Sequence, residues 1–263
     1  MQGIADYEFV QMIGESNYGE NYLARTPDRL QVPDEHVVVK VISGPTSEDA
    51  YRRATRELKH FSLARSDKLV SLYDVGRQGG TFYHVMEHLP LGSLQRPTRQ
   101  LSRTESTRAV AHAAEAAHAL HERGIAHRDI KPANIMLHEG GGKLSDLGLS
   151  QLLSPGMVFT GLGQIGLEFT DPAILVGAEA SRATDIWSLG ATLHYALTGS
   201  SVYGELPTNE PLLLVRAILA AAPAISSHLD AESAAVISRC LDADLSQRPG
   251  TAAELATQIS ALS

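Results

Sequence analysis

Hydrophobic and polar positions follow different patterns in the two parts of the chain. In the first hundred residues, short β-branched and aromatic runs are separated by Gly, Pro and Asp, a pattern typical of strands. These runs cover residues 7–11, 37–42 and 82–86. Within residues 47–63, apolar positions at Ala54, Leu58 and Phe61 follow the spacing of one helix face. We therefore predict a small sheet with one helix.

The remaining residues favour helices. Alanine, the best helix former, occurs 28 times in the last 163 residues against 5 times in the first 100. Apolar periodicity and end signals such as Gly124 and Gly199 delimit the predicted helices. These helices cover residues 104–123, 183–198, 210–222, 231–241 and 251–262. The chain as a whole therefore reads as an α+β protein with a strand-rich part followed by a helical part.

Three further segments carry local patterns that predict two turns and one helix. Residues 78–81 (Gln-Gly-Gly-Thr) and the glycines at 140–142 are typical of hairpin turns. The most apolar stretch, residues 212–225, is interrupted by Arg216 and Pro223 and is too short to cross a bilayer. We expect it to form a helix that faces the core, and we expect no membrane segment in this chain.

Composition and charge exclude several classes of protein. The 263 residues are 43% hydrophobic and 20% charged, which is globular usage for one large or two small domains. The net charge is −8, whereas a dedicated nucleic-acid binder usually carries an excess of basic residues. A single cysteine, Cys240, permits no internal disulfide and no thiolate zinc site, and it reads as a buried apolar residue. The N-terminus carries no secretory signal, so we expect a cytoplasmic location.

The chemistry is concentrated in residues 127–134, which read His-Arg-Asp-Ile-Lys-Pro-Ala-Asn. An acid, a base and an amide within so few residues suit the organisation of a hydroxyl nucleophile, a phosphate and a metal ion. Twelve residues after Asn134 comes Asp146-Leu147-Gly148, a second element typical of metal-assisted phosphoryl transfer. Their order and spacing have almost no competing structural reading.

With these motifs the sequence resembles eukaryotic-type Ser/Thr protein kinases, in a compact version similar to the bacterial branch. Asp185-Ile186-Trp187 and Arg248-Pro249 extend the resemblance over nearly the whole chain. The resemblance implies a two-lobed protein-kinase fold, with residues 1–87 as the small lobe, 88–92 as the hinge and 93–263 as the large lobe. It also implies that ATP binds between the lobes and that the γ-phosphoryl group passes to protein Ser or Thr hydroxyls.

The resemblance also implies a role for each catalytic candidate. Lys40 would hold the α- and β-phosphates and pair with Glu57, while Glu48 is better explained as a helix first-turn acid. Asp129 would accept the hydroxyl proton, and Lys131 would approach the transferred phosphate. Asp146 would bind Mg²⁺ between the phosphates, and Asn134 would bind a second Mg²⁺.

The remaining nucleotide candidates surround the base and the phosphates. They are Ile13, Gly14, Gly19, Asn21, Val38, Lys40, Met86, Glu87, Leu89, Asn134, Met136 and Asp146. Three positions depart from the family pattern: Ser16 replaces a glycine, Asn21 replaces the valine that covers adenine, and Val38 replaces an alanine. Because these changes add a side chain, a polar group and bulk, we predict unusually weak ATP binding.

The segment after Asp146 departs from the family as well. Ala173 stands where the family has a glutamate that pairs with the arginine matching Arg248. The buried pair is therefore either absent or rebuilt with another acid, since an unpaired buried charge is costly. Arg128 is the type of arginine that receives a phosphate from this segment. Thr160 is our preferred autophosphorylation site, and Ser154 and Thr170 are the other acceptors.

Several histidines have simpler readings than catalysis. By resemblance, His127 is a packing residue anchored by Asp185. His118 and His121 have a spacing that could bind a metal, but we interpret them as exposed helix residues.

Two alternatives to an active protein kinase stay open. The atypical residues favour a weakly active or inactive kinase-fold module that acts as a scaffold. A small-molecule phosphotransferase is disfavoured by Lys131. For an active kinase we expect a protein substrate with Ser or Thr acceptors, possible self-association for autophosphorylation in trans, and no nucleic acid.

Overall fold

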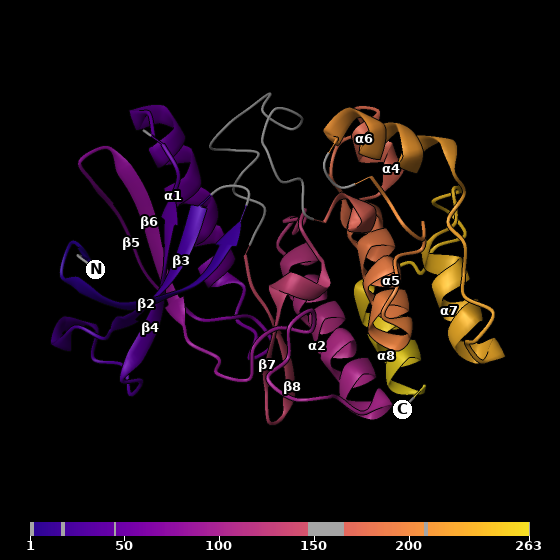
Figure 1. Ribbon diagram of the computed structural model, residues 1–263, viewed down its shortest axis with the longest axis horizontal. Helices are drawn as coiled ribbons and strands as arrows, with labels where there is room; N and C mark the ends of the chain where they lie inside the picture. The colour runs from indigo at the N-terminus through magenta and orange to yellow at the C-terminus, as the bar shows by residue number, and fades with distance from the viewer. Residues whose placement is uncertain (1–2, 17–18, 45, 147–165, 208–209, 263) are drawn as a thin grey trace. The chain divides into compact units, whose positions relative to one another are not determined.

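The computed structural model describes residues 3–16, 19–44, 46–146, 166–207 and 210–262. Within these ranges the chain forms two compact units. The first unit takes its described residues from Met1–Leu63 and Val70–His88. The second takes them from Ala64–Leu69, Leu89–Gly148 and Gly166–Ser263, so the six residues 64–69 group with the helical part. The two units are described separately below (Figure 1).

The first unit is an antiparallel sheet accompanied by a helix. Its strand order is β1-β2-β3-β4-β6-β5. The bounds are β1 (Gly3–Ile4), β2 (Tyr7–Ser16), β3 (Gly19–Arg25), β4 (His36–Ile42), β5 (Leu72–Gln78) and β6 (Thr81–Glu87), with the 3₁₀ turn η1 (Asp28–Leu30) and helix α1 (Glu48–Leu63). Gly79 and Gly80, both with positive φ, form the predicted turn between β5 and β6.

Alternation along β4 divides its residues between the two faces of the sheet. Val37 and Val39 are fully buried in a core with Tyr7, Ala24 and Val85. Because successive side chains of a strand point to opposite faces, Val38 and Lys40 lie on the other face. The sheet therefore presents these two nucleotide candidates side by side on one surface.

The second unit is mainly helical. Its helices are α2 (Arg103–His121), α4 (Pro172–Leu175), α5 (Arg182–Thr198), α6 (Pro211–Ala220), α7 (Ala231–Cys240) and α8 (Ala252–Ser260). The other elements are the hairpin β7 (Ile135–His138) and β8 (Gly141–Leu144) and the 3₁₀ turns η2 (Pro132–Asn134) and η3 (Leu167–Phe169). The alanine-rich face of α2 packs against α5, α8 and β8 (Figure 1). Small side chains allow this close approach.

The predicted α+β class is confirmed, and the long helices begin and end within two residues of their predicted bounds. Two local predictions were wrong in part. The β7–β8 turn lies at Glu139–Gly140, and Gly141 and Gly142 already belong to β8. Helix α6 is largely a surface helix: it buries Leu214 and Ile218 but leaves Leu212 77% exposed. No helix in the described ranges is both long and apolar enough to cross a membrane.

Candidate active site

A buried carboxylate on α5 fixes the backbone of residues 127–128. Asp185, 1% exposed, accepts hydrogen bonds from the backbone N–H of His127 at 2.7 Å and of Arg128 at 2.9 Å. Arg128 has a φ of 74°, a conformation that non-glycine residues hold only when their surroundings impose it. The predicted anchoring of this loop by Asp185 is confirmed.

His121 is the residue that sequence reasoning misplaced here. Its side chain is only 4% exposed, and its Nε2 lies 2.8 Å from Oδ2 of Asp185. The prediction of an exposed helix histidine was wrong, because the partner lies 64 residues away and leaves no local signal. His121 therefore belongs to the support of the loop.

His127 is a packing residue, as predicted. Its ring is fully buried, and its Nε2 lies 3.1 Å from the backbone oxygen of Ser145. Burial lowers the pKa of His127, so the ring is neutral near pH 7. The acid–base candidate of the loop is therefore Asp129.

The Asp129 carboxylate is held through both of its oxygens. The Lys131 ammonium lies 2.8 Å from Oδ1, and the Asn134 amide nitrogen donates to Oδ2 at 2.9 Å. The same nitrogen donates to the backbone oxygen of Asp129 at 2.8 Å. The carboxylate side chain remains 32% exposed, so an approaching hydroxyl can reach it. A fixed, accessible carboxylate is what a proton acceptor requires.

Asn134 and Asp146 lie at the two ends of the β7–β8 hairpin. Asn134 directly precedes β7, and Asp146 comes shortly after β8. Asn134 is 5% exposed, and its backbone oxygen accepts from the N–H and the hydroxyl of Ser145 at 2.8 and 3.1 Å. Asp146 comes directly after Ser145, with a φ of 58°. Because Nδ2 of Asn134 points to Asp129, the amide oxygen lies at the other side of the group. An amide oxygen and a carboxylate fit Mg²⁺, which prefers oxygen ligands. Leu147 and Gly148, the rest of the motif, lie outside the described residues.

In the first unit, Lys40 is 9% exposed on β4 and lies opposite Asn21 of β3 and His84 of β6. Glu57 is half-buried on α1, beside the buried face that carries Leu58. The ion pair between Lys40 and Glu57 stays a prediction.

The adenine candidates of the first unit include a matched pair on neighbouring strands. Val38 of β4 and Met86 of β6 are register partners, 7% and 9% exposed. The N–H of Glu87 donates to the backbone oxygen of Ser71 at 2.9 Å, which fixes the end of β6. Leu89 and Met136 belong to the second unit, where Leu89 is buried and Met136 is half-buried.

The nucleotide-loop candidates lie on the β2–β3 hairpin. Gly14 and Asn21 are register partners, and Ile13 is 43% exposed. Gly19 has a structural reason to be glycine, since a Cβ there would come within 2.0 Å of the backbone oxygen of Val41. The buried Oδ1 of Asn21 has no hydrogen-bond partner among the described residues. That orphaned acceptor is a cost at the position where the family places an apolar residue.

Arg248 forms its buried ion pair with an aspartate that stands at a different position from the glutamate of the family. Arg248 donates from Nη1 to Oδ2 of Asp171 at 2.5 Å, and both side chains are 3% exposed. Asp171 also caps α4, since Oδ1 accepts from the N–H of Ala173 at 3.0 Å. The acid therefore lies two residues before the position predicted from the family. Thr160 and Ser154 lie outside the described residues, whereas Thr170 is half-buried just before Asp171.

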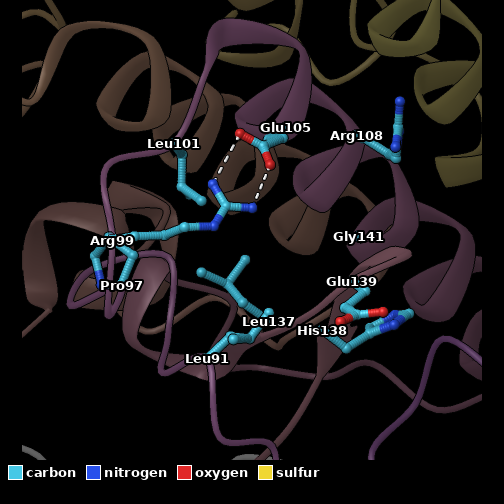
Figure 2. Close-up of a pocket in the computed structure, with 10 residues that line it drawn as sticks. All are labelled: Leu91, Pro97, Arg99, Leu101, Glu105, Arg108, Leu137, His138, Glu139 and Gly141. Atoms are coloured by element: carbon cyan, nitrogen blue, oxygen red, sulfur yellow. Dashed lines mark hydrogen bonds and ion pairs between the residues drawn. The ribbon is translucent and has the colours of Figure 1, made fainter.

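A small pocket lies elsewhere on the second unit. Figure 2 shows the Arg99 side chain between Leu101 and Leu137, with its guanidinium paired with Glu105. None of the predicted catalytic or nucleotide residues lines it. It is therefore distinct from the candidate active site.

These features define a class. Residues 7–260 match the protein kinase domain family, so the chain belongs to the protein kinase family, whose members use ATP. The predicted resemblance to Ser/Thr kinases is confirmed by similar proteins over nearly the whole chain.

Three relatives illustrate the match. The chain is 31% identical to the serine/threonine-protein kinase PknK of Mycobacterium tuberculosis over 97% of its own length. It is 29% identical to PknJ of the same organism over 96% and 28% identical to pkn2 of Myxococcus xanthus over 97%. It covers 23%, 44% and 32% of these proteins, less than half of each. The crystal structure of the M. tuberculosis PknI kinase domain has the same fold, with a TM-score of 0.69, 22% identity and coverage of 100% and 99% of the two chains.

Proposed function

We propose that the chain transfers the γ-phosphoryl group of ATP to Ser or Thr hydroxyls of protein substrates. The observation that carries this proposal is the Asp129 carboxylate, held by Lys131 and Asn134 on a loop that Asp185 anchors. A loop built in this way positions one proton acceptor and one ammonium without reorganisation during the reaction.

Two residues of the loop, Asp129 and Lys131, take part in the transfer itself. Asp129 accepts the proton of the attacking hydroxyl as the oxygen–phosphorus bond forms and the bond to the ADP oxygen breaks. The Lys131 ammonium, 2.8 Å from Asp129, neutralises charge on the transferred group. In the first unit, Lys40 supported by Glu57 would hold the α- and β-phosphates, and the adenine candidates would hold the base.

Asn134 and Asp146 would hold Mg²⁺ through their oxygens. The ion, when bound, neutralises phosphate charge and orients the phosphates. Autophosphorylation follows from the same chemistry, with Thr160 as the preferred acceptor and a second copy of the chain as the enzyme in trans.

One observation favours a second candidate, a weakly active or inactive scaffold. The orphaned Oδ1 of Asn21 places an unsatisfied polar atom where an apolar side chain normally covers adenine. This supports the predicted weak binding of ATP. A dissociation constant for ATP with Mg²⁺ in the low micromolar range or tighter would contradict it.

The test incubates the purified chain with labelled ATP and Mg²⁺, alone and with a generic basic protein substrate. Asp129→Asn and Asp146→Asn serve as controls, and labelled residues are mapped. Label that appears only with the unmutated chain supports the kinase function, and its position tests Thr160. No label together with an ATP-induced rise in melting temperature overturns that function in favour of the scaffold.

A further inference from the structure

Gly166 lies directly against the end of the Lys131 side chain. Both residues belong to the second unit. A Cβ built on Gly166 would stand 2.7 Å from Cδ of Lys131 and 3.4 Å from its Nζ. The first distance is shorter than real Cβ contacts, so any other residue at 166 requires the lysine to move.

The contact bears on Asp129 because of where Lys131 ends. Its ammonium lies 2.8 Å from Oδ1 of Asp129, and the lysine side chain is only 15% exposed. A lysine is long and flexible, and confining it to one rotamer costs entropy. The close approach of the main chain at Gly166 removes the space into which the end of this side chain would otherwise move.

We propose that Gly166 is a positioning residue, whose missing side chain holds the Lys131 ammonium against Asp129. The inference rests on the proposed function, since it concerns the proton acceptor of that reaction. A substituent at 166 would push Cδ and Nζ of Lys131 aside.

A second carboxylate near Gly166 also interacts with the charge of Lys131. Glu168 is half-buried two residues after Gly166, and burial raises its pKa while the charge of Lys131 opposes that rise. The ammonium is therefore within electrostatic reach of Glu168.

Backbone conformation offers a competing explanation, and the chain supplies its own control. Gly166 has a φ of 105°, which by itself favours glycine. Gly177 in the same unit has a φ of 100°, but a Cβ there would have no atom within 4 Å. Gly177→Ala therefore reproduces the backbone cost without the contact to a lysine.

The first test measures kcat and KM for ATP in Gly166→Ala and Gly177→Ala, each with Lys131 intact and in a Lys131→Ala background. We expect Gly166→Ala to lower kcat about tenfold with KM within twofold, and Gly177→Ala to leave kcat within twofold. In the Lys131→Ala background, Gly166→Ala should change kcat less than twofold, since the two substitutions remove one interaction. Equal losses in both backgrounds would overturn the proposal.

The second test needs no activity. Lysines labelled with ¹³C at Cε give one NMR signal each, and the Lys131→Ala spectrum identifies that of Lys131. Gly166→Ala and Asp129→Asn should both shift this signal, and Gly177→Ala should not. An unchanged signal in Gly166→Ala refutes the proposal even in an inactive protein, whereas absence of phosphoryl transfer in the unmutated chain refutes the proposed function alone.

The double variant, Gly166→Ala with Lys131→Ala, also tests the proposal if Gly166→Ala alone fails to fold. If Gly166→Ala does not fold, removal of the lysine end should relieve the clash, so Gly166→Ala with Lys131→Ala should fold. If neither folds while Gly177→Ala does, the requirement at 166 is independent of Lys131 and the proposal is wrong.

Discussion

Replacement of Asp171 by Asn tests the rebuilt pair with Arg248. The change preserves size and leaves an oxygen that can still cap α4, but it places an amide or a neutral oxygen where Arg248 now meets a carboxylate at 2.5 Å. The guanidinium keeps two neutral acceptors, the backbone oxygens of Ala183 and Asp242, each at 2.8 Å. A buried cation is then left without its counter-charge.

The size of the effect follows from burial. Both side chains are 3% exposed, so solvent cannot replace the lost partner. Removing one member of a buried pair costs about 3–5 kcal/mol, and the two remaining acceptors place the expected loss near about 3 kcal/mol. For a chain of this size, that loss lowers the Tm by roughly 6–12 °C.

The assay is urea unfolding followed by circular dichroism, with a matched control. Asp67→Asn makes the same chemical change in an exposed pair, where Asp67 is 83% exposed and Lys68 lies 2.8 Å away. Exposed ion pairs contribute less than about 1 kcal/mol, so this variant should differ little from the unmutated chain. Equal free energies of unfolding for the two variants would refute the assignment of Asp171 as the buried partner.

Two further predictions concern buried groups of the second unit. Burial raises the pKa of the Cys240 thiol to about 12, so iodoacetamide should label it only after unfolding, while a cysteine placed at the exposed position Ser227 should react at once. Rapid labelling of folded Cys240 would show that α7 opens readily. Burial lowers the pKa of His194, whose Nδ1 donates to Ser200 and whose Nε2 accepts from the N–H of Ser226 at 3.1 Å. Because the unfolded chain binds the proton more tightly, the free energy of unfolding should fall as pH drops below the ordinary histidine value of 6.5. His194→Gln should make that dependence shallower in unfolding curves at pH 5.5–7.5, and an unchanged slope would contradict the reasoning.

Local patterns predicted most helices because their signals lie within each segment. Helix α5 has a capping box at Ser181 and Thr184 and ends at Gly199, so both of its ends are encoded nearby. The strands β3 and β5 were not among the predicted strand runs, although the turn that follows β5 was predicted. Strand β5 contains Asp74, Gly76 and Arg77 and is only half-buried, and its conformation depends on pairing with β6. The periodicity of hydrophobic residues within one segment does not predict pairing with another strand.

The residues of the candidate site likewise fall into those that local motifs predict and those that depend on distant contacts. Residues 127–134 were recognisable because the chemistry needs fixed residue types at fixed spacing. The support of that loop was only partly recognisable: Asp185 lies in a motif, but His121 contacts it from a helix with no distinguishing pattern. Gly166 carried no signal either, because its role depends on the path of a side chain 35 positions earlier. Contacts between distant residues decide such roles, and one sequence does not reveal them.

The anchoring of the loop by Asp185 ties its motion to the opening of a helix. The amide protons of His127 and Arg128 end on a carboxylate in the first turn of α5, among the most buried residues of the second unit. Loops usually exchange amide hydrogens quickly through local fluctuations, whereas buried helices exchange by rarer, larger openings. These two amides should therefore inherit the slow exchange of α5. A loop that looks like a surface connection in the sequence should therefore exchange its amide hydrogens as part of the helical core.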